Sequence, residues 1–276
     1  MSARQLDDKS YHQFRVFLEQ QCGIVLGESK QYLVKSRLAP LMSTFDLSSL
    51  SELVNRTLSP VERQLRAAVI DAMTTNETLW FRDDYPFKLL KRQLLPDLAD
   101  RKTPVKIWSA ASSSGQEPYS IAMSVLEYQQ TNPLAFPRGV EVIGTDISTT
   151  MLEHCKQGQY DSLALARGLS AERKTKFFEP GDNGMLKVKE QVRKMVSFRP
   201  LNLLNSYSLM GRFDIVFCRN VLIYFSPEIK AQIIGQIHAS LNNAGYLFLG
   251  ASESLSGLND NFNMLRCKPG IVYQKK

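Results

Sequence analysis

Apolar residues in the first 75 positions recur at the three- and four-residue spacing of amphipathic helices. The pattern is clearest from Tyr11 to Leu18, from Leu50 to Leu58 and from Leu65 to Ala72. Each such segment has one apolar face, which must pack against a neighbour to leave water. The sequence therefore predicts a small all-α domain over residues 1–75.

Short apolar runs follow beyond residue 93 and alternate with stretches of helical character. Strands that alternate with helices favour a mostly parallel sheet. The chain ends with MLRCKPGIVYQKK, which predicts an antiparallel hairpin around Pro269 and Gly270. The predicted parallel strands are residues 105–108, 140–146, 196–199, 213–218 and 246–250.

Residues 160–195 interrupt this alternation. SAERKTKFF predicts a helix, and PGDNG separates FFE from MLKVKEQV as a hairpin turn would. We therefore expect a small antiparallel β insertion. The whole pattern favours an α/β fold of the class I methyltransferase type, Rossmann-like with a mostly parallel sheet and a terminal antiparallel hairpin, over residues 93–276.

The segment VKIWSAASSSGQEPYS, residues 105–120, predicts a strand, a loop of small residues and a helix that has Pro118 as its first residue. Such a loop lets a ligand lie directly against the backbone. Its single glycine, Gly115, does not make a dinucleotide fingerprint. Glu117 would repel a phosphate and suits an ammonium group, so S-adenosylmethionine fits better than a dinucleotide. An ordinary strand-to-helix loop is the alternative.

The second predicted strand ends in an acid, Asp146. An acid at this place, beside the first loop, can accept hydrogen bonds from both ribose hydroxyls of a nucleoside. Alternatively Asp146 caps the helix that follows, although Ser148 can cap that helix itself.

The segment TTNETLWFRDDYPF mixes polar and aromatic residues, and we expect residues 76–92 to be a linker that contributes to an active site. A plain helix cap at Thr75 or Asn76, with Trp80 and Phe81 as packing residues, is the alternative.

The net charge of +7 is distributed unevenly. The first 80 residues hold nine basic and nine acidic side chains, so the excess lies beyond them. Within the helical part, Lys30, Lys35 and Arg37 have no acid among them and can face either an acidic partner or water.

Cysteine and histidine are sparse. Four cysteines form no CxxC pair, and there are three histidines, so neither a disulfide framework nor a metal site is expected. No run of about 18 apolar residues occurs. We expect a cytoplasmic protein with no membrane insertion.

Six segments in order, TTNETLWFR, WSAASSSGQEPYS, GTDIS, LNLL, FCRNVLIYF and GASES, resemble the CheR-type chemotaxis receptor O-methyltransferases, along the whole chain. The resemblance implies methyl transfer from S-adenosylmethionine to glutamate side chains in the cytoplasmic domains of chemoreceptors. S-adenosylhomocysteine would be the product, and a monomer without metal or nucleic acid is expected.

The resemblance also implies a cofactor site and a reacting centre. Arg82 and Tyr224 match the catalytic positions, and Gln116 stands where the family often has a second acid. The division of roles between Arg82, Arg219 and Tyr224 stays open. The implied cofactor-binding residues are Asn76, Thr78, Arg82, Ala111, Glu117, Asp146, Asn202, Leu203, Arg219 and Asn220.

The implied chemistry needs no general base, because a glutamate with a pKa of about 4.3 is already ionised at neutral pH. The enzyme must mainly align donor and acceptor. In some family members the inserted hairpin also binds a pentapeptide at the receptor's C-terminus. The short PGDNG link predicts that this chain works without that tether.

Two other functions are weighed against this one. A nucleic-acid methyltransferase is favoured by the net charge, but Asn220 and Tyr224 are separated by VLI without the proline pair typical of enzymes that methylate adenine. The second alternative is a catalytically idle module that binds S-adenosylmethionine and docks on receptors.

Overall fold

The computed structural model describes residues 6–268 and 270–276. The chain divides into two compact units. The first comprises Met1–Thr75 with Tyr224–Ile229, and the second comprises Asn76–Ile223 with Lys230–Lys276. We call them the helical unit and the sheet unit.

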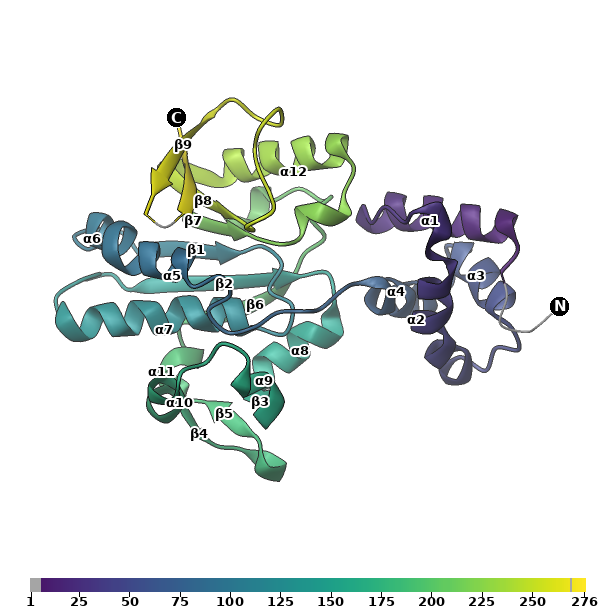
Figure 1. The fold of residues 1–276 in the computed structure, drawn as a ribbon, viewed down its shortest axis with the longest axis horizontal. Helices are drawn as coiled ribbons and strands as arrows, with labels where there is room; N and C mark the ends of the chain where they lie inside the picture. Colours follow the sequence, from purple (N-terminus) through teal and green to yellow (C-terminus); the bar gives the residue numbers. More distant parts are fainter. Residues whose placement is uncertain (1–5, 269) are drawn as a thin grey trace. The chain divides into compact units, whose positions relative to one another are not determined.

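The helical unit is built from helices, as the apolar spacing predicts (Figure 1). The side chain of Asp7 accepts a hydrogen bond from Ser10 N at the start of the first helix, and that of Ser49 accepts from Glu52 N at the third. Phe14 and Leu53 are fully buried in this unit. Its elements are α1 (Asp8–Cys22), η1 (Glu28–Lys30), α2 (Gln31–Thr44), α3 (Leu50–Leu58) and α4 (Arg63–Met73).

The three basic residues noted in the sequence do different things. The Arg37 guanidinium donates to the carbonyls of Met73 at 2.6 Å and Thr74 at 3.0 Å, where α4 ends. A cation at a helix C-terminus stabilises the unpaired carbonyls there. Arg37 therefore has a structural role, whereas Lys30 and Lys35 are exposed.

The described residues of the sheet unit form a seven-stranded sheet in the order β6-β2-β1-β7-β8-β10-β9. The first five strands are parallel and the last two antiparallel, which confirms the predicted sheet. Pro269, placed by prediction at the last turn, lies outside the described residues. The strands are β6 (Val196–Pro200), β2 (Val140–Asp146), β1 (Val105–Ser109), β7 (Phe213–Cys218), β8 (Leu241–Leu249), β10 (Gly270–Lys275) and β9 (Phe262–Cys267).

Every residue of β7 is buried, as expected for a strand inside a parallel sheet that is covered on both faces. The rings of Phe87, Phe217 and Phe248 stack successively at centroid distances of 6.0 and 4.6 Å. Since β6, β2, β1 and β7 are parallel, the loops at their carboxyl ends meet along one edge of the sheet.

Two predicted helix ends are wrong. The helix after β1 begins at Gln116, so Pro118 is its third residue and not its first, still within the turn whose N–H groups need no helical partner. For the helix after β7, Ser226 and Pro227 predict the N-cap and first residue and the sequence predicts an end near Gly245, but the helix ends at Ser240, because Leu241 pairs with Phe213. The other helices outside the insertion are α5 (Tyr85–Leu89), η2 (Leu90–Leu94), α6 (Leu95–Leu98), α7 (Gln116–Thr131), α8 (Thr149–Gln157), η4 (Ser208–Met210), η5 (Leu222–Tyr224) and α12 (Pro227–Ser240). The last residue of η5 and the first three of α12 belong to the helical unit.

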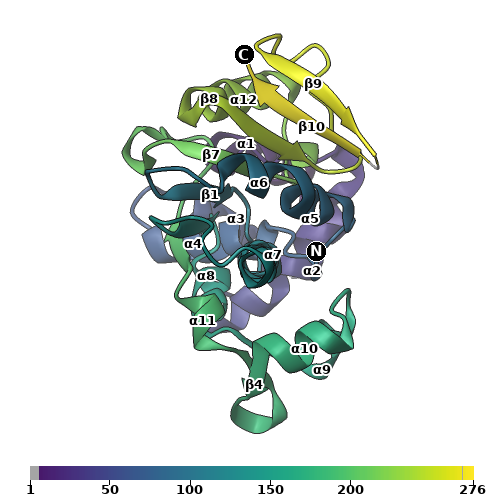
Figure 2. The same ribbon diagram turned by 90° about the vertical axis from the view of Figure 1, so that its left-hand side faces the viewer.

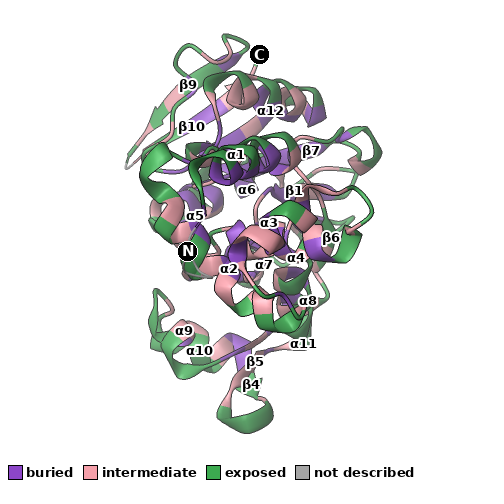
Figure 3. Ribbon diagram, turned by 90° about the vertical axis from the view of Figure 1, so that its right-hand side faces the viewer, coloured by how far each residue is buried: buried purple, intermediate pink, exposed green. Residues whose placement is uncertain are grey.

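The insertion lies below the main sheet in Figure 2 and forms a three-stranded antiparallel sheet of order β3-β5-β4 among the described residues. Its second hairpin strand is shorter than MLKVKEQV, because a helix begins at Glu190. Figure 3 shows that its helices and hairpin tip are largely exposed. Its elements are β3 (Gln159–Tyr160), α9 (Ser162–Ala166), α10 (Ala171–Phe177), β4 (Phe178–Pro180), η3 (Asp182–Gly184), β5 (Leu186–Val188) and α11 (Glu190–Arg193).

None of the helices in the described part of the chain has the length and apolar character needed to cross a bilayer.

Replacing Arg37 by alanine should lower the free energy of unfolding by about 1 kcal/mol, because the carbonyls at the end of α4 lose a charged donor that is partly exposed. Lys35→Ala, on the same helix and exposed, should change it by less than about 0.5 kcal/mol. Urea unfolding followed by circular dichroism measures both. Equal effects of the two substitutions would refute the capping role of Arg37.

Candidate active site

The loop after β1 is held in one shape by contacts from three directions. Ser112 N donates to Thr145 O at 2.8 Å, which fastens the loop to the end of β2. Behind it, Cys155 Sγ donates to Ser113 O at 3.1 Å and Tyr160 Oη donates to Ser114 O at 2.7 Å. The loop backbone therefore keeps its other side for a ligand.

Gly115 ends this loop with φ of 94°, a conformation that residues with a Cβ rarely adopt. A Cβ atom here would lie 2.9 Å from Tyr160 Oη and 3.0 Å from Cys155 Sγ. The glycine lets the loop turn tightly into α7, so that Glu117 lies in the first turn of that helix.

Asp146 is buried at the end of β2, and both of its carboxylate oxygens are held. Oδ2 accepts from Ser113 N at 2.7 Å and Oδ1 accepts from Ser148 N at 2.9 Å. The cap of α8 is Ser148, whose side chain accepts from Met151 N. A carboxylate can accept about four hydrogen bonds, so these two backbone contacts alone do not use all the acceptor sites of Asp146.

The loop after β6 lies beside Asp146, because Leu201 N donates to Asp146 O at 2.9 Å. Asn202 follows, with its Oδ1 accepting from Leu204 N at 3.0 Å, and Leu203 is buried. These contacts place Asn202 and Leu203 next in line along the same edge of the sheet.

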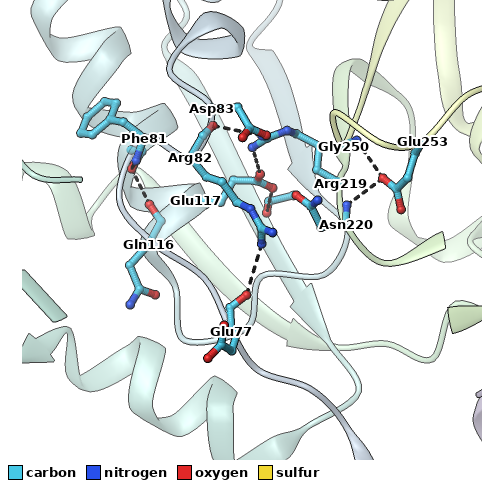
Figure 4. A network of polar contacts seen from close by, with 12 residues as sticks. Glu77, Phe81, Arg82, Asp83, Gln116, Glu117, Arg219, Asn220, Gly250 and Glu253 are labelled. Carbon is cyan, nitrogen blue, oxygen red and sulfur yellow. Dashed lines mark hydrogen bonds and ion pairs between the residues drawn. The ribbon is translucent and has the colours of Figure 1, made fainter. Parts of the chain in front are cut away.

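Arg219 carries the central ion-pair network, at the end of β7 (Figure 4). Its Nη1 donates to Glu117 Oε2 at 2.8 Å, and its Nη2 donates to Asp83 Oδ2 at 2.6 Å and to Arg82 O at 3.0 Å. Ser109 Oγ donates to the other oxygen of Glu117 at 2.8 Å. One guanidinium thus faces two carboxylates, so this trio carries a net negative charge that suits a cationic ligand.

The linker meets both the loop and α7. Ser113 Oγ donates to Asn76 O at 2.9 Å, and Phe81 N donates to Ser120 Oγ at 3.1 Å. The Arg82 guanidinium has a weaker contact, at 3.3 Å from Glu77 O. The backbone of Arg82 is therefore fixed, while its side chain remains available to a carboxylate.

Glu253 fixes the turn that follows Arg219. Its Oε2 accepts from Asn220 N and from Gly250 N, each at 2.7 Å, and its Oε1 accepts from Ile223 N at 3.3 Å. Asn220 has φ of 57°, so this carboxylate stabilises a strained backbone position. Glu253 joins the loop after β8 to the loop after β7.

Sequence reasoning assigned no role to Asp83 or Glu253. Both stand inside quoted segments, beside Arg82 and within GASES, which was the signal that could have found them. Gln116 is buried, and its Oε1 accepts a hydrogen bond from Ser114 Oγ at 2.8 Å. A neutral amide can therefore make this contact where the family often has an acid.

Some predicted site residues are not joined to the others. Within residues 6–268 and 270–276, no hydrogen bond or ion pair links Thr78, Ala111 or Leu203 to another predicted site residue. Thr78 nevertheless lies in the linker, and Ala111 lies in the loop after β1. Tyr224 belongs to the helical unit, where its carbonyl accepts from Val25 N at 2.9 Å.

These residues fit S-adenosylmethionine by their chemistry. The loop after β1 has only small side chains, Asp146 has oxygens that suit a ribose, and Glu117 has oxygens that suit an ammonium. Arg219 Nε and Asn220 Oδ1 are buried without a partner in the described structure. Buried polar atoms without a partner are expected where a ligand supplies the missing hydrogen bonds. No group of three or more metal-ligating side chains occurs among the described residues.

The comparisons agree with this geometry. The profile described as "CheR methyltransferase, SAM binding domain" matches residues 76–271, and that described as "CheR methyltransferase, all-alpha domain" matches residues 9–74. The chain belongs to the CheR methyltransferase family. The S-adenosylmethionine-binding domain of the family corresponds to the sheet unit. The predicted class I fold with an all-α N-terminal domain is confirmed.

Relatives of this CheR-family chain align with it from end to end. It is 60% identical over 276 residues to the chemotaxis protein methyltransferase of Vibrio parahaemolyticus serotype O3:K6, with 100% of both chains covered. It is 59% identical over 276 residues to chemotaxis protein methyltransferase 1 of Vibrio cholerae serotype O1, and 52% identical over 278 residues to chemotaxis protein methyltransferase 1 of Pseudomonas aeruginosa, again with 100% of both chains covered.

Asp146→Asn should weaken binding of S-adenosylhomocysteine at least about tenfold, because an amide nitrogen would face a backbone N–H and remove a ribose acceptor. Asp161→Asn is the matched control, since Asp161 Oδ1 caps α9 by accepting from Ala164 N and asparagine caps equally well. Titration calorimetry measures both affinities. Unchanged affinity in a folded Asp146 variant would exclude Asp146 from the site.

Proposed function

We propose that this CheR-family methyltransferase transfers a methyl group from S-adenosylmethionine to glutamate side chains of chemoreceptors. The observation that carries the proposal is the position of Arg82. Its carbonyl and the neighbouring Asp83 carboxylate both bind Arg219, which also binds Glu117 of the candidate cofactor site. A guanidinium beside a cofactor site, held by no carboxylate and only weakly by Glu77 O, suits an anionic acceptor.

Arg82 orients the acceptor carboxylate in this proposal. A planar guanidinium can donate two parallel hydrogen bonds to a carboxylate, which fixes direction as well as distance. S-adenosylmethionine, when bound, supplies a methyl group on a positively charged sulfur. The acceptor is already ionised, so the site's task is alignment and not proton removal. Tyr224 is proposed as a second catalytic residue on the strength of the resemblance.

The cofactor roles are likewise proposals. Asp146 would hold the ribose, Asn202 and Leu203 would flank the adenine, and Glu117 would accept from the amino group. Arg219 keeps Glu117 in place while leaving oxygen lone pairs on it for that contact. The methionine end would lie toward the linker that contains Asn76, Thr78 and Arg82.

Docking on the receptor is proposed to involve the exposed Lys30 and Lys35. Arg37 is not part of this face, since its guanidinium is held at the end of α4. Attraction between exposed charges falls as salt is added, so methylation of acidic receptor helices should be salt-sensitive.

The enzyme is also proposed to work without a receptor tail tether. Peptides that add to a sheet need an open strand edge with free backbone groups. In the insertion, β5 is paired on both sides, and the edge strand β4 has three residues and ends in Pro180. An edge this short offers few backbone groups to a peptide.

The direct test uses labelled S-adenosylmethionine with receptor-containing membranes, followed by measurement of alkali-labile methyl esters. We expect esters on the receptors. Methylation of DNA or RNA with none of receptors would favour a nucleic-acid enzyme. Cofactor binding without methylation of any of them would favour the idle docking module.

Arg82→Ala should lower kcat by about a hundredfold, the usual loss when one positioned donor at a reacting centre is removed, with little change in S-adenosylhomocysteine affinity. Arg82→Lys should recover part of the rate, because it keeps the charge but not the fork. Arg92→Ala, exposed on η2, is the control. An equal loss of rate and cofactor affinity in Arg82→Ala would assign Arg82 to the cofactor instead.

A free pentapeptide copied from a receptor C-terminus should release no heat when titrated into the enzyme. Deleting that tail from the receptor should leave the initial rate of methylation within twofold of the intact receptor. Binding of the peptide at micromolar concentrations would show that a tether site exists on this chain.

A further inference from the structure

The turn that carries Arg82 is strained. Phe81, Asp83 and Asp84 have positive φ values, of 49°, 64° and 53°. Residues with a side chain are strained at positive φ, and a bulky aromatic there is an outlier. A turn of this shape persists only where neighbouring contacts hold it, so these contacts decide where Arg82 lies.

The insertion holds the residue before the turn. Trp80 is fully buried and packs edge-on against Tyr160 at 4.9 Å and Phe178 at 5.3 Å, which come from β3 and β4. Its N donates to Arg167 O at 3.0 Å. Gly168 approaches so closely that a Cβ there would lie 2.1 Å from Trp80 O. The chain therefore enters the turn from a position that the insertion fixes.

Phe81 itself is clamped from two sides. Its ring meets Phe87 edge-on at a centroid distance of 5.1 Å, and the Arg173 guanidinium lies 3.5 Å from its centroid. Arg173 comes from α10 of the insertion. A guanidinium this close to an aromatic ring is attracted to the ring face, and this attraction offsets strain in the backbone of Phe81.

Arg173 is itself fixed by Glu127 of α7. Its Nε donates to Glu127 Oε1 at 2.6 Å and its Nη2 donates to Oε2 at 3.1 Å, while Lys91 Nζ donates to Oε2 at 2.6 Å. Burial alone would raise the pKa of Glu127, but the hydrogen bonds from Arg173 and Lys91 outweigh it and the pKa lies below its usual value. The bidentate pair holds the guanidinium plane over Phe81.

We propose that Arg173 is a positioning residue for Arg82, and that the insertion thereby belongs to the catalytic apparatus. Stacking on Phe81 keeps that residue in its left-handed conformation, which directs the next residue, Arg82, toward the candidate site. The catalytic consequence rests on the proposed function. The positional claim does not, because it concerns the turn alone.

The positional claim is tested by hydrogen exchange of the full-length protein. In Arg173→Ala, backbone amides of residues 80–85 should exchange at least tenfold faster, since Phe81 N and Asp84 N are hydrogen-bonded only while the turn is formed. The matched control is Lys176→Ala on the same helix, whose ammonium lies near the Phe177 ring and bonds Gln130. It should leave these amides unchanged. Unchanged exchange in Arg173→Ala overturns the proposal.

The catalytic consequence is tested with the same variants. Arg173→Ala should lower kcat about tenfold while the Kd for S-adenosylhomocysteine stays within twofold. Arg173→Lys keeps a charge for Glu127 but lacks the planar group that stacks on Phe81. Its kcat should therefore lie between those of the wild type and Arg173→Ala. A merely structural role would instead lower the Tm, kcat and cofactor affinity together, which would overturn the assignment.

The two failures are distinguishable. If the wild-type enzyme forms no receptor esters, the proposed function fails, and exchange still decides whether Arg173 holds the turn. If the wild-type enzyme is active and Arg173→Ala loosens the turn without lowering kcat, the positioning role is wrong while the proposed function stands.

Discussion

The arrangement of the candidate site depends on the pairing of one buried guanidinium. The Arg219 side chain is 1% exposed, and a charge so far from water requires partners of opposite sign. Those partners, Glu117 and Asp83, come from α7 and from the linker turn. Pairing Arg219 therefore brings the end of β7, the helix after the first loop and the segment with Arg82 to one place.

The parallel sheet supplies the frame for this pairing. The carboxyl ends of β6, β2, β1 and β7 lie along one edge, and the backbone of the loop after β1 is fastened to β2 through Thr145 and Asp146. Asp146 and the loop after β1 are thus held by strands and by backbone hydrogen bonds, which keeps them in fixed relative positions without a ligand.

Strain in the linker turn is balanced from outside the main sheet. Phe81 and Asp83 hold left-handed conformations that their own sequence does not favour, and contacts from Arg173 and Arg219 hold one residue each. A small insertion that reads in sequence as an appendage is therefore packed against the most strained part of the site. Its removal would affect Arg82, and it would also take from the loop after β1 the hydrogen bond that Tyr160 donates to Ser114 O.

The sequence by itself determined the sheet, because its apolar strands and amphipathic helices have periods visible within a few residues. It also led to Glu117, Asp146 and Arg219, which stand at strand ends or in a small-residue loop. Helix ends were less certain: a strand pairing at Leu241, and not local propensity, ended α12. Only the tertiary structure decided that Arg37 caps α4, that Glu253 holds Asn220, and that Arg173 covers Phe81. These contacts join residues from 33 to 92 positions apart, and no local pattern encodes which distant partner a charged side chain will meet.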